Sequence, residues 1–290
     1  MARSLLIIGA AGQTGRHTVE SLLERGHRVR ALVHRSDERS ERLAGLGAEV
    51  VEGDVLALDD VARATEGIDA LYLTYPIRTG LLEATANVAQ AAEENGVGAI
   101  VNMSQISARR NTASTAARQH WVAERLLDRS PVAVTHLRPT FFAEWLVNMW
   151  DGSGELRLPF ADARHAPIAA VDQARVIAAI LDDPAPHAGK IYPLYGAVEL
   201  DHHEIAAEMT KALGRRVTYV PIELDEFEQI LLKRGAPPHM IQHLLAVAVD
   251  YRDGVFSGMN DLVEQITGTA PLDVAGFIDR YRSFYEDYLV

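Results

Sequence analysis

Leu5-Leu6-Ile7-Ile8-Gly9-Ala10-Ala11-Gly12-Gln13-Thr14-Gly15 is the most informative segment of this 290-residue sequence. An apolar run is followed by three evenly spaced glycines and then by an amphipathic stretch over residues 16–25. This order predicts a strand, a tight turn and a helix. Backbone N–H groups at the start of such a helix bind phosphate, and glycines let the phosphate approach the backbone. The segment therefore predicts a nucleotide site, with a purely structural turn as the alternative. The residues expected to contact the nucleotide are Gly9, Ala11, Gly12, Gln13, Thr14 and Gly15.

The composition excludes several classes of protein. Hydrophobic residues make up 48% of the sequence and charged residues 23%, as is typical of a globular protein. The net charge of −12 argues against a nucleic-acid surface, which needs clustered lysine and arginine. The sequence has no cysteine, no apolar run as long as a membrane span, and no apolar leader before the glycine turn. We therefore expect a cytoplasmic protein that binds neither nucleic acid nor a membrane.

Short apolar runs alternate with amphipathic segments through the first half of the sequence. The runs are nearly continuous Val, Ile, Leu and Ala, as in strands that helices cover on both faces. This alternation predicts an α/β fold of the Rossmann type, a doubly wound parallel sheet with its ligand at the carboxyl ends of the strands. The expected strands are residues 4–8, 28–33, 48–52, 70–74, 99–103 and 132–137, and the expected helices are residues 14–25, 40–46, 58–65, 80–95 and 113–128.

The second half of the sequence has a different character. An aromatic segment occupies residues 141–150, a helix is expected at 171–181 and a short strand at 190–194. From His202 onward helices are expected to dominate, at residues 204–213, 226–234, 238–251, 261–266 and 274–285. We predict a nucleotide-binding domain over residues 1–150, to which residues 166–183 return, and a smaller, mostly helical substrate domain over residues 151–290.

The end of the second expected strand indicates which dinucleotide binds. NAD sites place a carboxylate about 20 residues after the glycine turn, whereas NADP sites place a cation nearby. Arg35 occupies this position, and no carboxylate lies between Arg28 and Ser36. A guanidinium can bind the 2′-phosphate through two hydrogen bonds, and Arg16 is a second candidate cation. We therefore predict NADP(H) in preference to NAD(H), with a merely solvated Arg35 as the alternative.

Together with later motifs, these residues resemble the NmrA-like family of atypical short-chain dehydrogenases/reductases over nearly the whole sequence. The resemblance implies an NADP(H)-binding Rossmann domain with a small C-terminal substrate domain. Some members reduce quinones, azo dyes, triarylmethane dyes or related aromatic compounds, whereas others act as redox sensors for a regulatory partner. The fold alone does not choose between these activities. The motifs are Gly9-Ala10-Ala11-Gly12-Gln13-Thr14-Gly15-Arg16, Val29-Arg30-Ala31-Leu32-Val33, Gly53-Asp54-Val55, Leu137-Arg138-Pro139 and Gly189-Lys190-Ile191-Tyr192.

The resemblance also implies contacts to the cofactor. It assigns Asp54 and Val55 to the surroundings of the adenine, and the loop Thr74-Tyr75-Pro76 to the diphosphate and ribose, with Tyr75 facing the nicotinamide. Met103 and Ser104, at the end of the fifth expected strand, complete the predicted cofactor contacts. Ser104 also lies where relatives keep a residue that polarises the substrate, although serines at strand ends commonly form turns.

The usual catalytic pair of the wider superfamily is missing. Ordinary short-chain dehydrogenases use Tyr-x-x-x-Lys, in which the lysine lowers the pKa of a proton-donating tyrosine. Ala116 and His120 occupy these positions, and no tyrosine lies between Tyr75 and Tyr192. On a helix His120 shares a stripe with Glu124, which could orient the imidazole. We name His120 as the candidate catalytic residue, which contacts the nicotinamide ribose or relays a proton; a buried structural histidine is the alternative.

The aromatic segment after the sixth expected strand begins at the ligand edge of the sheet. Phe141, Phe142 and Trp145 are the predicted substrate contacts, with a packed core as the alternative. An apolar cleft without a strong acid suits a flat conjugated acceptor. We therefore predict an NADPH-dependent reductase of a small aromatic or quinone-like compound, and a non-catalytic NADP(H) sensor as the alternative.

Two further expectations concern metals and assembly. His202, His203 and Glu204 lack the spacing of a metal site, so we predict no bound metal. An exposed helix over residues 80–95 is the candidate surface for a homodimer.

Overall fold

The computed structural model describes residues 2–287, and within them seven strands form one parallel sheet. The strand order is β3-β2-β1-β4-β5-β6-β8, with every neighbouring pair parallel. The doubly wound sheet predicted from the apolar runs is confirmed, and its order reverses between β1 and β4. The strands are Ser4–Ile8 (β1), Arg28–Val33 (β2), Glu49–Glu52 (β3), Ala70–Leu73 (β4), Ala99–Met103 (β5), Ala133–Pro139 (β6) and Ile191–Leu194 (β8).

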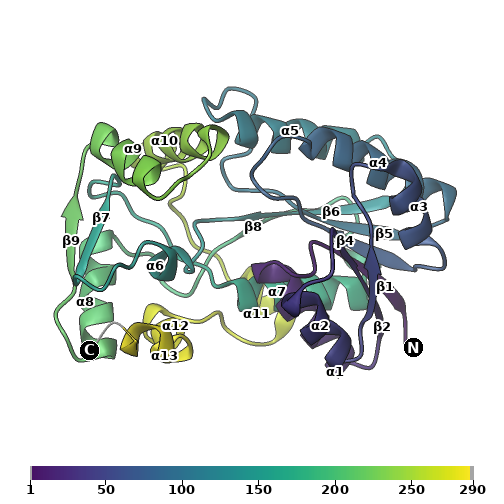
Figure 1. Ribbon diagram of the computed structural model, residues 1–290, viewed down its shortest axis with the longest axis horizontal. Helices are drawn as coiled ribbons and strands as arrows, with labels where there is room; N and C mark the ends of the chain where they lie inside the picture. The colour runs from purple at the N-terminus through teal and green to yellow at the C-terminus, as the bar shows by residue number, and fades with distance from the viewer. Residues whose placement is uncertain (1, 288–290) are drawn as a thin grey trace.

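Helices cover both faces of this sheet, as Figure 1 shows. Apolar residues of one helical layer pack with Leu6, Leu71 and Ile100 of the sheet, and those of the other layer pack with Leu5, Ile7 and Val101. The alternation of side chains along each strand sends neighbours to opposite faces, which is why continuous apolar runs suit this sheet. The first layer consists of α3 (Leu58–Thr65), α4 (Leu81–Glu94) and α5 (Thr115–Leu127); the second consists of α1 (Gln13–Glu24), α2 (Glu38–Gly45), α7 (Ala170–Asp182) and α11 (Leu262–Thr267).

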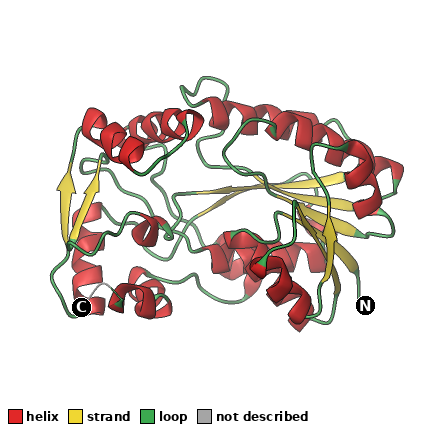
Figure 2. Cartoon of the chain, in the orientation of Figure 1, coloured by secondary structure: helices red, strands yellow, loops and turns green. Residues whose placement is uncertain are grey.

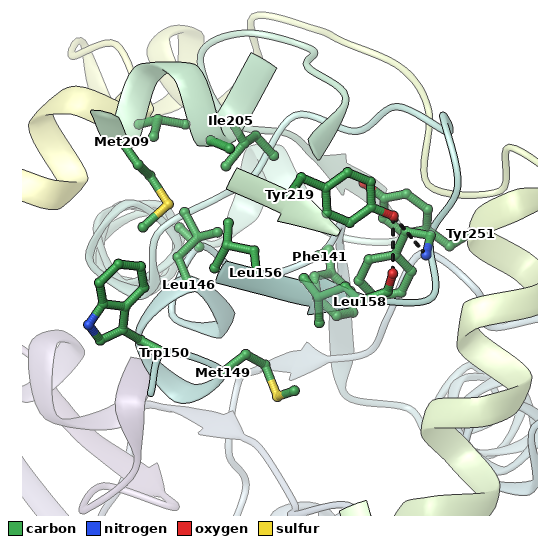
Figure 3. Packing of buried hydrophobic residues seen from close by; sticks show 14 of the residues in the cluster. Phe141, Leu146, Met149, Trp150, Leu156, Leu158, Ile205, Met209, Tyr219 and Tyr251 are labelled. Carbon is green, nitrogen blue, oxygen red and sulfur yellow. Dashed lines mark hydrogen bonds between the residues drawn. The ribbon is translucent and has the colours of Figure 1, made fainter. Parts of the chain in front are cut away.

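A second hydrophobic core lies beyond the carboxyl ends of the strands, and Figure 2 shows that it is mostly helical. Its small parallel sheet joins β7 to β9, and the Tyr219 hydroxyl donates to the Leu158 carbonyl at 3.1 Å, as drawn in Figure 3. The elements are α6 (Trp145–Asn148), β7 (Glu155–Leu158), α8 (His202–Leu213), β9 (Thr218–Pro221), α9 (Leu224–Lys233), α10 (Pro238–Arg252), α12 (Val274–Arg280) and α13 (Arg282–Glu286). Neither β7 nor β9 is predicted from the sequence, and the single helix predicted over residues 274–285 is divided into α12 and α13 at Tyr281.

The chain alternates between the two cores. Residues of the segment 141–160 lie in the second core, whereas Ile168, Val176 and Leu194 lie in the first. The segment 205–256 belongs to the second core, Val263 of α11 returns to the first, and the chain then re-enters the second. Phe141, Met149 and Trp150, which follow the end of β6, thus pack in the second core.

Candidate functional site

The glycine turn after β1 is closed by its own backbone. Gly9 has φ of 78°, and the Gly12 amide donates to the Gly9 carbonyl at 2.9 Å. A Cβ at Gly15 would lie 2.2 Å from the Gly9 carbonyl oxygen, and one at Gly9 would lie 2.5 Å from Cγ2 of Thr74. Only glycine therefore permits this approach of helix α1 to the strand. The first turn of α1 lies against an open pocket, which is the arrangement that binds a diphosphate.

A pocket of about 530 Å³ extends from this turn across the carboxyl ends of the strands. Gly15 does not line it but packs beneath the turn. Four strand ends besides β1 contribute residues, as expected for a ligand at the switch point of a doubly wound sheet. The predicted cofactor residues among its lining are Gly9, Ala11, Gly12, Gln13, Thr14, Arg35, Asp54, Val55, Thr74, Tyr75, Pro76 and Met103.

Cationic side chains line the pocket beyond the end of β2. Arg35 is exposed and forms no ion pair within residues 2–287, whereas Arg39 pairs with Asp37 at 2.6 Å. The hydrogen bond from Arg39 lowers the pKa of Asp37 to about 2, so the Asp37 carboxylate is ionised at neutral pH and remains paired with Arg39. Arg16, the second candidate cation, does not line the pocket, and its guanidinium donates to Gln13 at 3.1 Å. Of these three arginines, Arg35 lines the pocket without an ion-pair partner among the described residues.

Asp54 stabilises the turn in which it lies through local hydrogen bonds. Its Oδ1 atom accepts from the Leu56 amide at 2.9 Å, and its amide donates to the Asp60 carboxylate at 2.8 Å. The carboxylate therefore shapes the wall of the pocket as well as lining it.

Tyr75 is buried at the middle of the site, and its ring is fixed by its neighbours. Its hydroxyl donates to the Thr79 carbonyl at 2.8 Å, and the Arg78 guanidinium lies 5.1 Å from the ring centroid. Gly80 has φ of 109°, and a Cβ there would lie 2.5 Å from the Tyr75 hydroxyl oxygen. This hydroxyl proton is already used by the backbone, so Tyr75 does not replace the missing tyrosine acid.

A second chamber of about 270 Å³ adjoins the first pocket. Within the described part of the chain its lining residues include no Asp, Glu, Lys or Arg, so they place no carboxylate, ammonium or guanidinium on its wall. The predicted residues Phe141, Phe142 and Trp145 are among them, and Phe141 also packs in the second core. Five residues line both spaces, namely Thr74, Tyr75, Pro76, Met103 and Phe142.

His120 projects from α5 to the wall of this chamber. It is buried, and its Nδ1 has no hydrogen-bond partner among the described residues. Burial lowers the pKa of His120 to about 4, which leaves the imidazole neutral at pH 7. A buried polar atom without a partner is uncommon in folded proteins, which marks His120 as a candidate contact for a ligand in the chamber.

Glu124 does not hold His120 through a hydrogen bond, contrary to the suggested orienting role. Its fully buried carboxylate instead accepts from the Ser104 hydroxyl at 2.6 Å and from Nε of Arg138 at 2.8 Å. A buried carboxylate needs such partners because an unpaired one would be strongly destabilising. Ser104 lines the chamber but directs its hydroxyl proton to Glu124.

The family of the chain follows from its match to a family model. The model of the NmrA-like family matches residues 1–286. The chain belongs to the NmrA-like family.

Individual relatives agree with this assignment. This NmrA-like chain is 28% identical to an NAD(P)H azoreductase of Xenophilus azovorans, with 94% of the chain and 96% of the relative covered. It is 28% identical to quinone oxidoreductase 2 of Escherichia coli, covering 80% and 82%. The crystal structure of the Escherichia coli NADPH-dependent quinone oxidoreductase complexed with NADPH has a TM-score of 0.84 at 25% identity, covering 96% of this chain and 99% of that one.

Several lining residues of this NmrA-like protein are absent from the sequence-based prediction. His34, Arg39 and Arg78 line the nucleotide pocket, and His243 with Leu244 of α10 lines the chamber. The strand-end rule could have found His34, but no local pattern links α10 to the sheet edge. Within residues 2–287 no helix is long and apolar enough to cross a membrane, and no group of three acidic or histidine side chains is arranged to hold a metal ion.

Proposed function

We propose that this protein is an NADPH-dependent reductase of a small aromatic or quinone-like acceptor. The observation that carries the proposal is the pair of adjoining spaces, a nucleotide pocket with a glycine turn and an uncharged chamber, which share five lining residues. A dinucleotide seated on the turn can extend toward Tyr75 and Phe142, where the chamber begins. The names of the azoreductase and quinone oxidoreductase relatives support the same class of reaction.

Each part of the pocket has a proposed role. The glycine turn holds the diphosphate, Arg35 binds the 2′-phosphate and thereby favours NADP(H) over NAD(H), and Asp54 with Val55 borders the adenine. NADPH, when bound, supplies a hydride to the acceptor. The narrow approach at Gly9 and Gly15 fits a diphosphate because no side chain blocks the amides.

His120 is proposed to contact the nicotinamide ribose or the acceptor as a neutral hydrogen-bonding group. A general acid works best when its pKa lies near the working pH, and a pKa of about 4 is too low for that at pH 7. Reduction of a conjugated acceptor yields a delocalised anion or a neutral product. Such chemistry demands little of a protein acid, which agrees with the missing Tyr-x-x-x-Lys pair.

The test is oxidation of NADPH by the purified protein with a naphthoquinone, an azo dye and a cationic triarylmethane dye. We expect turnover with at least one acceptor, and a large loss in Phe142→Ala, because Phe142 lines both spaces. Val198→Ala is the control, since Val198 is exposed and lines neither space. No turnover with any acceptor, combined with tight NADPH binding, would refute the reductase and favour the sensor.

Two structural expectations accompany the function as proposals. We propose the division into a nucleotide domain and a substrate domain, and a homodimer formed through the outer face of α4, which exposes Glu83, Gln90 and Glu93. Light scattering of the purified protein measures the oligomeric state directly.

A further inference from the structure

Helix α10 is tied to the segment that leads into α5, as their proximity in Figure 1 suggests. The Gln242 side chain donates to the Ala113 carbonyl at 2.9 Å and accepts from the Thr115 amide at 3.1 Å. Asp250 accepts from the Arg109 guanidinium at 2.8 Å. These bonds join the second core to the helix that carries His120. They fix α10 as a wall of the chamber.

His243 is the polar residue that α10 contributes to this wall. Its Nδ1 lies 2.7 Å from the hydroxyl oxygen of Ser114, the N-cap of α5. The same oxygen accepts from the Ala117 amide at 3.0 Å. Ser114 is fully buried, and within residues 2–287 its hydroxyl proton has no other acceptor than Nδ1 of His243.

The direction of this hydrogen bond determines where His243 carries its proton. A buried hydroxyl that donates to nothing costs free energy, so the Ser114 hydroxyl donates and Nδ1 accepts. In a neutral imidazole one nitrogen bears the proton and the other accepts, so the proton resides on Nε2. Burial lowers the pKa of His243 to about 4, which keeps the ring neutral at pH 7.

We propose that His243 determines substrate specificity by donating a hydrogen bond from its Nε2–H group to a carbonyl oxygen of the acceptor. Ser114 is the positioning residue that fixes this tautomer of His243. The inference rests on the proposed reductase function and names the chemical feature that the chamber recognises. Among residues 2–287 no charged side chain lines the chamber, so a neutral donor suits a neutral quinone oxygen. His120 lines the same chamber, so two neutral imidazoles contribute to its wall.

The first test measures the tautomer in the full-length protein without any substrate. Long-range proton–nitrogen correlation spectra of histidine-labelled protein distinguish a protonated Nε2 from a protonated Nδ1. We expect His243, identified by comparison with His243→Gln, to carry its proton on Nε2, and Ser114→Ala to mix the two forms. A proton on Nδ1 in the unaltered protein would overturn the proposal.

The second test measures recognition with a naphthoquinone as the probe. His243→Phe keeps a planar ring but loses the donor, so we expect kcat/KM to fall about three- to tenfold, mainly through KM, with the NADPH Kd unchanged. His243→Gln should recover most of this loss because its amide nitrogen can donate from a similar position. His239→Phe is the matched control, because His239 lies on the same helix but is exposed and outside the chamber.

The third test separates failure of this inference from failure of the proposed function. Trp145 lines the chamber, so quenching of tryptophan fluorescence reports naphthoquinone binding without turnover. If no acceptor oxidises NADPH, the reductase is refuted, but a three- to tenfold weaker quinone Kd in His243→Phe still supports the role of His243. Equal quinone binding by His243→Phe and the unaltered protein, or no binding by either, would overturn it.

Discussion

Arg35→Ala should abolish most of the preference for NADPH. Arg35 is exposed at the rim of the pocket and is not engaged by any carboxylate within residues 2–287. A 2′-phosphate carries nearly two negative charges, and each interacts with a cation about 4 Å away by about 1 kcal/mol in water. The expected loss of about 2 kcal/mol corresponds to roughly 30-fold weaker NADPH binding. NADH lacks this phosphate, and its Kd should change less than about twofold.

Calorimetric titration of both coenzymes at two salt concentrations is the assay. Because salt screens exposed charges, the difference in NADPH Kd between Arg35→Ala and the unaltered protein should become smaller at high salt. Arg39→Ala should have a smaller effect, since Asp37 already pairs with Arg39. Arg42→Ala is the control, because Arg42 is exposed on α2 but does not line the pocket. An unchanged ratio of the two Kd values in Arg35→Ala would refute the role of Arg35.

Three further perturbations test the turn, the buried ion pair and the buried histidines. Gly15→Ala places a Cβ 2.2 Å from the Gly9 carbonyl, so NADPH binding should be lost and urea unfolding should show about 2 kcal/mol lower stability. Glu124→Gln leaves the Arg138 guanidinium without its carboxylate and should lower the free energy of unfolding by about 3 kcal/mol, measured by urea denaturation. The pKa values of His120 and His202 are lowered by burial to about 4 and about 3, whereas in the unfolded chain they return to 6.5. The unfolded chain therefore binds more protons below pH 6.5, and stability should fall between pH 6.5 and 4 by on the order of 3 kcal/mol per buried histidine, measured as the urea midpoint against pH.

The glycine and histidine perturbations each have a matched control, and a specific outcome would contradict each of the three expectations. Gly45→Ala meets no atom within 4 Å in helix α2 and should be neutral or stabilising, so an equal loss there would contradict the steric argument. A stable Glu124→Gln variant would show that Arg138 finds another partner. For the histidines, a flat urea midpoint between pH 6.5 and 4 would mean that the rings take up protons in the folded state. The exposed His239→Gln variant should not alter that profile.

The sheet and its glycine turn could be predicted because their signals are local. Continuous apolar runs specify buried parallel strands, and the residue after each run must lie at one edge of the sheet. Arg35 and Met103 lie at strand ends that this rule identifies, whereas Thr74 is implied by the family resemblance, and all three line the pocket. The role of Arg35 in coenzyme preference stays a prediction until the titrations are made.

The rest of the site depends on contacts between distant segments. His243 reaches the chamber because α10 folds back onto residues 109–115, more than 120 positions earlier in the sequence. Strands β7 and β9 have four residues each, and their pairing across about 60 positions leaves no periodic signal. Glu124 lies four residues after His120 on the same helix, and this spacing suggests that it orients the imidazole. Its carboxylate instead accepts from Arg138, a stronger partner on a neighbouring strand.

The alternation of the chain between its two cores limits how the protein can be divided or recombined. Cleavage near residue 150 would separate α7, β8 and α11 from the sheet that they complete. A fragment ending there would expose β6 as an unpaired edge and leave apolar surface beneath α1 uncovered. A chimera that exchanges the second core between relatives would need several junctions, so single substitutions in the chamber wall are the simpler way to alter the chamber.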